Sequence, residues 1–214
     1  MKGYIGSTGE FYPSVTTVIH ILGSKKISRW ANYLGFKHMD FDKELLKAAE
    51  FGTAAHAFCR QILDPSAPNP DPYECTLEEK AKLKNVILSF MQFQEIHHIK
   101  AIVTEYEMVS DELKVGGTCD VYGSFEYKGQ HYEDCIIDFK TAKRVQEIMW
   151  LQLGAYYLLL KEKGYNPKYG VILRLRPEAS LPSIIEEDKL IEYGNAFVTL
   201  KHFFDFWSQH ENIE

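Results

Sequence analysis

The sequence predicts an α/β (α+β) fold with a mixed central sheet flanked by helices and preceded by a helical part. Helical patterns fill most of residues 1–100, strand-like apolar runs begin near residue 102, and helix and strand patterns then alternate. The 214 residues are 45% hydrophobic, which suits one domain over 1–214. Within it we expect a mainly helical N-terminal part (1–100), a sheet and helix (101–176) and a C-terminal helix (177–214).

The N-terminal part contains four segments with helical patterns, expected at 14–22, 27–36, 43–63 and 76–97. Thr76 followed by Glu79 is a capping box, which marks the start of the fourth helix. The segment 64–75 contains four prolines and is therefore expected to be a loop. We interpret this loop as a surface excursion in preference to a lid over a ligand.

Strands are expected at 102–109, 118–127, 131–140 and 169–176. The second and third form a hairpin whose predicted turn is Lys128-Gly129-Gln130. A helix over 145–163, ended by Gly164, leads to the fourth strand. A last amphipathic helix is expected at 190–208. One face of this helix is predicted to pack in the core and carries Ala196, Phe197, Leu200, Phe203, Phe204 and Trp207.

The predicted hairpin carries two carboxylates and a lysine. Side chains alternate along a strand, so Asp138 and Lys140 point to one face and Phe139 points to the other. A three-residue turn places Asp120 opposite Asp138, with Cβ atoms about 5 Å apart. Carboxylates at that separation repel each other unless a cation lies between them. The hairpin therefore predicts a site for a hard divalent cation beside a lysine, which suits phosphoryl chemistry.

Further polar residues stand out, although each has an ordinary structural explanation when taken singly. Gln152 and Tyr156 are four residues apart on a mostly apolar helix and share a face, where Tyr156 would be core and Gln152 would bond to the backbone. His56 follows Gly52 in an apolar run and would be a hydrogen-bonded core histidine. Glu105 would be an exposed strand carboxylate.

Composition excludes several classes of protein. The net charge of −6 argues against a protein that coats duplex nucleic acid. The sequence contains neither an apolar run long enough for a membrane nor a signal-peptide pattern, so we expect a cytoplasmic protein. The cysteines lack zinc-finger spacing, so neither zinc nor an iron–sulfur cluster is expected, and no nucleotide cofactor is expected. They are Cys59, Cys75, Cys119 and Cys135.

In combination, these residues resemble the RecB-type branch of the PD-(D/E)xK nucleases. The motifs of that branch are G-x-x-x-H, E-x-x-hydrophobic-x-S, G-x-x-D, h-h-D-x-K-T and Q-x-x-x-Y. They correspond here to 52–56, 105–110, 117–120, 136–141 and 152–156. The opening 13–18, together with Trp30, resembles the mitochondrial genome maintenance exonucleases and their phage-type relatives. The chain lacks the four-cysteine cluster of some relatives and has no helicase segment.

The resemblance implies a PD-(D/E)xK restriction-endonuclease-like core and a metal-dependent DNA exonuclease that acts on single strands or free ends. Mg²⁺ or Mn²⁺ would be held by Asp120, Asp138, the backbone carbonyl of Phe139, His56 and Glu105. The catalytic residues would be Asp120, Asp138, Lys140, Gln152 and Tyr156. Contacts to DNA would come from Ser14, Thr16 and Trp30. The implied partners are DNA and replication or recombination proteins.

Two alternatives to the exonuclease remain open. The same chemistry serves a structure-specific endonuclease, and the same fold serves a nucleic-acid-binding module without catalysis. The negative net charge and the absence of a motor segment favour the binding module. The presence of every charged residue of the predicted site argues against it.

Overall fold

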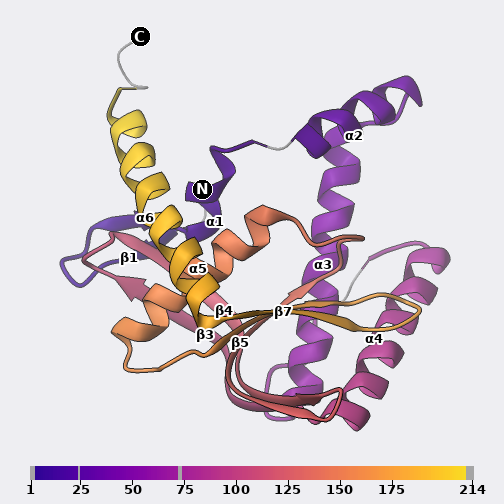
Figure 1. Ribbon diagram of the computed structural model, residues 1–214. Helices are drawn as coiled ribbons and strands as arrows, with labels where there is room; N and C mark the ends of the chain where they lie inside the picture. Colours follow the sequence, from indigo (N-terminus) through magenta and orange to yellow (C-terminus); the bar gives the residue numbers. More distant parts are fainter. Residues whose placement is uncertain (1–2, 24, 72–73, 211–214) are drawn as a thin grey trace.

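A five-stranded mixed sheet forms the centre of the protein, with helices packed on both of its faces (Figure 1). The computed structural model describes residues 3–23, 25–71 and 74–210. The strand order is β3-β4-β5-β6-β7, and all neighbours are antiparallel except β5 and β6. The strands are β3 (Lys100–Ser110), β4 (Val115–Tyr127), β5 (Gln130–Lys140), β6 (Tyr169–Arg174) and β7 (Leu181–Glu186). The predicted mixed α+β architecture is therefore confirmed.

Parallel strands need a crossover connection, and α5 (Glu147–Glu162) supplies it between β5 and β6. The helices α1 (Val15–His20) and α6 (Glu187–His210) lie on the same face of the sheet as α5. The opposite face is covered by α3 (Phe41–Leu63) and α4 (Leu77–His97). Figure 1 shows these two layers with the sheet between them.

The alternation of side chains along the central strands divides the core into two clusters. Ile136 and Ile172 pack beneath α5 and α6, whereas Ile137 and Val171 pack against α3 and α4. Central strands that are buried on both faces need apolar residues at successive positions, which explains the continuous run before Asp138.

The N-terminal part is mainly helical, as predicted, but it also contains a short antiparallel pair. This pair consists of β1 (Gly3–Ile5) and β2 (Phe11–Pro13), which the sequence analysis did not predict. The helix α2 (Lys25–Phe36) projects from the end of α3 as an arm (Figure 1). The capping box of α4 is present as predicted, and Gly164 follows α5 with a φ of 85°.

The structure corrects the prediction at the C-terminal end of the sheet. The strand β7 was missed because Pro182 interrupts a short run of mixed polarity. Proline is tolerated there because β7 is an edge strand and pairs only with β6. The following helix starts at Glu187, earlier than the expected residue 190.

The predicted core face of α6 is correct only for part of the helix. Phe197 and Leu200 are buried and Phe204 is partly buried. Phe203 and Trp207 are 53% and 51% exposed, because the C-terminal part of α6 extends past the sheet (Figure 1). Ala196 also faces solvent. The sequence pattern reports an apolar face but not how far the rest of the fold covers it.

The hairpin turn is one residue shorter than predicted, and a β-bulge compensates for the difference. Tyr127 pairs with Gln130, so the loop is Lys128-Gly129, both with the positive φ that a two-residue hairpin favours. An irregularity then shifts the register near Asp134, whose φ is 54°. Beyond it the ladder ends with Val121 opposite Ile137, and the carboxylate of Asp120 accepts a hydrogen bond from the backbone amide of Phe139. The predicted turn was therefore wrong, and the pairing of Asp120 with Asp138 stays a prediction.

We predict that Gly154→Ala destabilises the protein by about 1–3 kcal/mol, the usual cost of overpacking. A Cβ at residue 154 would lie 2.5 Å from the backbone nitrogen of Gly194, so α5 and α6 would have to separate. Thermal unfolding measures the effect. Gly35→Ala is the control, because a Cβ there meets open space on α2 and should be neutral or slightly stabilising. Equal melting temperatures for the two variants would contradict the predicted close contact.

Candidate metal centre

Three elements bring together a histidine and two carboxylates. His56 comes from α3, Glu105 from β3 and Asp120 from β4, and one ligand atom of each lies within 4.8 Å of the others. Nδ1 of His56 lies 3.3 Å from Oδ2 of Asp120. The imidazole packs edge-on against Phe139, with ring centroids 5.7 Å apart. One nitrogen and two carboxylate donors could hold a divalent metal ion.

Local irregularities in both strands create this cluster. Cys119 and Tyr122 pack in the same core cluster, whereas Val121 packs in the opposite one, so the alternation along β4 breaks at Asp120. On the neighbouring strand Glu105 has a φ of 47°, a left-handed conformation that a residue with a side chain seldom adopts. Strained backbone of this kind concentrates at functional sites.

Next to this cluster, a continuous chain of polar contacts links β5 to α5. Nζ of Lys140 lies 2.6 Å from Oδ2 of Asp138 and donates a hydrogen bond to Oε1 of Gln152 at 3.1 Å. Nε2 of Gln152 donates in turn to the hydroxyl of Tyr156 at 2.8 Å. The side chains of Asp138 and Lys140 thus lie on one face of β5, and Gln152 and Tyr156 share one face of α5.

The two halves of the site meet at the hairpin. The backbone amide of Phe139 donates to Oδ2 of Asp120 at 2.6 Å. Phe139 itself packs on the opposite face against Phe90. Gly117 provides space for Tyr156, because a Cβ there would lie 2.6 Å from the tyrosine ring. The proposed role of the Phe139 carbonyl as a ligand stays a prediction.

Burial and neighbouring charges shift the pKa values of Asp120 and Asp138 in opposite directions. Burial and the nearby Asp120 raise the pKa of Asp138, although Lys140 opposes the shift. Burial would also raise the pKa of Asp120, but His56 and Lys140 outweigh it and lower that pKa. Burial would lower the pKa of Lys140, but Asp138 and Asp120 raise it. This network carries excess negative charge, which a divalent cation would offset.

The donor chemistry of the cluster supports this interpretation. Asp138 is 2% exposed and its Oδ2 is paired with the ammonium of Lys140. His56, Glu105 and Asp120 offer one nitrogen and two carboxylate donors within 4.8 Å of one another. The residues present therefore fit a divalent metal ion in donor type.

These residues line a cleft of about 840 Å³. Ser14 and Thr16 also line it, but Ser14 is the buried N-cap of α1 and accepts a hydrogen bond from the amide of Thr17. The segment 68–71 of the proline-rich loop forms another wall, held to α3 by a 2.6 Å hydrogen bond from Gln61 to Asn69. This part of the loop therefore borders the cleft, and its interpretation as a surface excursion stays a prediction.

The predicted DNA contact Trp30 lies elsewhere. It lines a second cleft of about 1090 Å³ between α2, α3 and the segment after β5, and packs edge-on against Phe41. The structure does not place it with the carboxylates.

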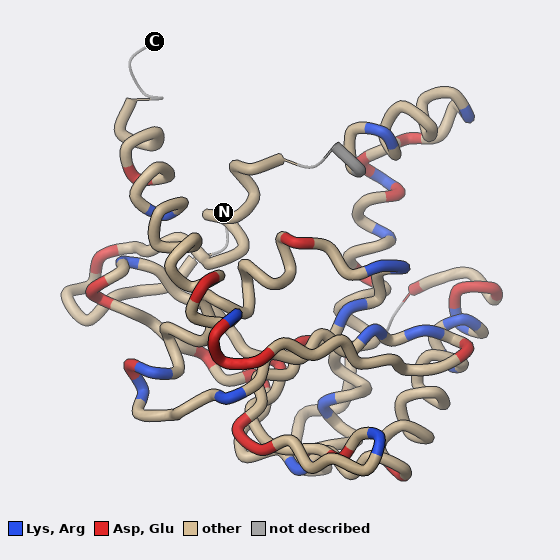
Figure 2. The backbone as a smooth tube through the Cα atoms, viewed as in Figure 1, with Lys and Arg blue, Asp and Glu red and all other residues tan. Residues whose placement is uncertain are grey.

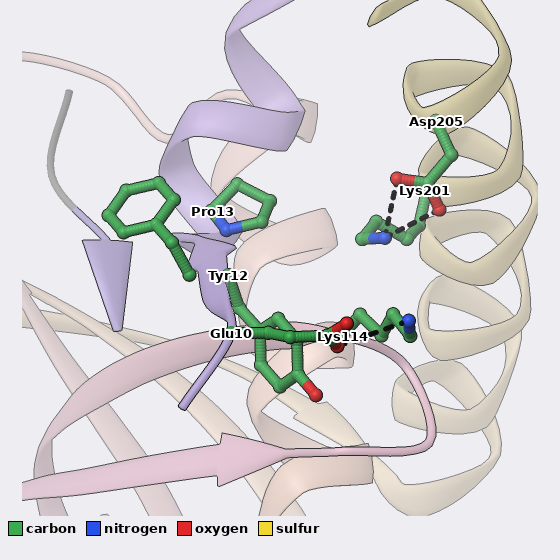
Figure 3. A pocket seen from close by; sticks show the side chains of 7 residues that line it. Glu10, Tyr12, Pro13, Lys114, Lys201 and Asp205 are labelled. Atoms are coloured by element: carbon green, nitrogen blue, oxygen red, sulfur yellow. Dashed lines mark hydrogen bonds and ion pairs between the residues drawn. The ribbon is translucent and has the colours of Figure 1, made fainter. Parts of the chain in front are cut away.

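A third, smaller cavity of about 390 Å³ lies between β2 and α6 (Figure 3). Its charged side chains pair with one another. Nζ of Lys201 donates to both carboxylate oxygens of Asp205 at 2.7 and 2.6 Å, and Lys114 pairs with Glu10 at 3.3 Å. None of the predicted site residues lines this cavity.

The structure also reveals a cleft residue that the sequence analysis missed. Arg60 lies on α3 one turn beyond His56 and lines the cleft. The four-residue spacing from His56 was the available signal, because residues at i and i+4 share a helix face.

Comparisons with known proteins leave the function open. No family model and no curated protein matches the chain. A solved structure described as the crystal structure of SSO0001 is similar at 14% identity, with a TM-score of 0.29 over 55% of this chain and 59% of that one. The chain thus spans about three fifths of the length of SSO0001. None of the helices in the described part of the chain combines the length and apolar composition needed to cross a membrane.

We predict that Mn²⁺ raises the melting temperature of the wild-type protein and that Asp120→Asn removes most of this shift. An ion at a hundredfold its Kd stabilises the folded state by about 2.7 kcal/mol. Glu178→Gln is the control, because this exposed glutamate lies outside the cleft. A full Mn²⁺ shift in Asp120→Asn would exclude Asp120 as a ligand.

Proposed function

We propose that this chain is a divalent-metal-dependent DNA nuclease with a PD-(D/E)xK core, and that it acts as an exonuclease on single strands or free ends. The observation that supports this most is the convergence in one cleft of a His/Glu/Asp cluster and the Asp138–Lys140 pair. The order of these residues along the chain resembles that of the RecB-type nucleases, which supplies the choice of DNA as substrate.

The site would hold Mg²⁺ or Mn²⁺ through Asp120, Asp138, His56 and Glu105. Oxygen donors suit Mg²⁺, and the imidazole favours Mn²⁺. The bound ion would polarise the scissile phosphate and lower the pKa of a water molecule.

The protein's own contribution centres on Lys140. Its side chain is 21% exposed and lines the cleft, while Asp138 and Gln152 fix the position of its ammonium. It would donate a hydrogen bond to the attacking water or to a phosphoryl oxygen and stabilise the negative charge that develops there. Gln152 orients Lys140, and Tyr156 orients Gln152.

The charge distribution favours local binding of a strand over coating of a duplex. Along the backbone, Lys and Arg positions are interspersed with Asp and Glu positions (Figure 2). A single strand drawn into one cleft needs only a few cations at that place. Duplex binding depends on neutralising many phosphates at once.

We predict that Lys140→Met abolishes metal-dependent degradation of linear single-stranded DNA. The change removes the ammonium that would stabilise the developing charge, an effect of several kcal/mol in preorganised sites. The assay compares linear and circular single strands with Mg²⁺, Mn²⁺ or EDTA. Lys189→Met, which removes an exposed lysine on α6, is the control and should keep full activity.

Each outcome of this assay has a definite meaning. Loss of only the linear substrate supports an exonuclease, whereas cleavage of the circle indicates an endonuclease. DNA binding without cleavage in the wild type would favour the non-catalytic module. Substantial cleavage by Lys140→Met would overturn the role assigned to this lysine.

A second prediction compares the contributions of Gln152 and Tyr156 to kcat. Gln152→Ala should lower kcat strongly, because Lys140 loses its hydrogen-bond acceptor. Tyr156→Phe removes one hydrogen bond to Gln152, so kcat should fall only about two- to thirteenfold, as 0.5–1.5 kcal/mol implies. Steady-state kinetics of both variants on one oligonucleotide tests this order. A larger loss in Tyr156→Phe than in Gln152→Ala would contradict it.

A further inference from the structure

The cleft contains a cation that the mechanism above does not use. The charged residues of the described chain that line it are Arg60, Asp71, Glu105, Asp120, Asp138 and Lys140. Lys140 is engaged by Asp138. Arg60 forms no ion pair with any described residue, and its Nε is buried without a hydrogen-bond partner.

The carboxylate nearest along the chain does not engage Arg60. Asp64 follows Arg60 by four residues, and its Oδ1 accepts hydrogen bonds from the amide and hydroxyl of Ser66. These bonds lower the pKa of Asp64, and the charge of Arg60 contributes to the shift. Leaving a buried nitrogen without a partner disfavours the folded state unless something binds there. Arg60 lines the cleft and pairs with no carboxylate of the described residues, so its guanidinium can offer its charge to a ligand there.

The position of Arg60 suits a strand that passes the metal centre. One turn of α3 separates it from His56, a rise of about 6 Å along the helix axis. The wall of the cleft formed by 68–71 is anchored beside it through Gln61 and Asn69. A guanidinium presents a planar fork of donors that matches two oxygens of one phosphate.

We propose that Arg60 binds a phosphate group of the substrate strand next to the one held at the metal centre, and so sets the register of the strand. This inference rests on the proposed nuclease function. The phosphate is either an internal diester or the phosphate at the end of the strand, and both offer the same oxygens to the guanidinium.

Steady-state kinetics on single-stranded oligonucleotides test the proposal. Arg60→Gln should raise KM at least about tenfold, as expected for loss of a charged hydrogen bond, with a smaller change in kcat. Arg60→Lys should restore part of the affinity, because it keeps the charge without the fork. Arg144→Gln is the matched control, since Arg144 is exposed and does not line the cleft. The Mn²⁺-induced shift in melting temperature should be unchanged in Arg60→Gln, which separates phosphate binding from damage to the metal site.

Substrate variants locate the phosphate. A neutral methylphosphonate is placed at successive linkages, and the terminal phosphate is present or absent. At the contacted linkage the neutral group should raise KM for the wild type and have no further effect in Arg60→Gln. If only the terminal phosphate behaves in this way, Arg60 recognises the strand end; if an internal linkage does, it recognises the diester backbone.

The failure of this inference is distinguishable from failure of the proposed function. An unchanged KM in Arg60→Gln, with wild-type cleavage intact, overturns the role of Arg60 alone. If the wild type does not cleave DNA, anisotropy with a labelled single strand in the presence of Mg²⁺ decides. Weaker binding by Arg60→Gln then supports the phosphate contact without catalysis, and equal binding overturns it.

Discussion

The structure of the site depends on the buried ion pair between Asp138 and Lys140. Charged groups in a protein interior are tolerated only when they are paired and hydrogen-bonded, since removal of either partner leaves an uncompensated charge. The pair therefore requires a fixed acceptor for the remaining protons of Lys140, which Gln152 supplies from α5. Gln152 in turn requires Tyr156, whose ring fits only because residue 117 is glycine. The crossover helix α5 is thus held to the hairpin by hydrogen bonds and an ion pair as well as by apolar packing.

Irregular backbone brings the side chains of the His56, Glu105 and Asp120 cluster next to this pair. A regular hairpin with a two-residue loop would place Val121 opposite Ile136, and the bulge at Asp134 shifts its partner to Ile137. The interrupted alternation at Asp120 turns its carboxylate toward His56 on the α3 side of the sheet, while Asp138 lies on the α5 side. The site therefore gathers residues from α3, from α5 and from the strands β3, β4 and β5 between them. Glu105, with its positive φ, lies at the same place, and strained backbone of this kind concentrates at functional sites.

Local rules predicted what local geometry controls. Alternation along a strand placed Asp138 with Lys140, helical spacing placed Gln152 with Tyr156, and capping chemistry marked the start of α4. Features that depend on distant segments were missed or misread. The sequence shows that Phe203 and Trp207 continue an apolar face. It does not show that the end of α6 extends past the sheet and leaves both side chains exposed. Nor does the sequence show that the proline-rich segment folds back onto α3. The hydrogen bond from Gln61 to Asn69 depends on the path that the loop takes, which no local pattern reports.

The charges of the cleft connect metal binding with substrate binding. Four carboxylates and two cations line it among the described residues, so without a metal ion the cleft is acidic and repels a phosphate strand. A single divalent ion would balance the two excess negative charges of the cleft. Its attraction to the carboxylates would be strong because several of these groups are shielded from solvent. Affinity for a strand should therefore increase when the ion is present, and by linkage the strand should increase affinity for the ion. A protein of net negative charge can in this way bind a polyanion at one place, with its carboxylates serving as metal ligands instead of as a barrier.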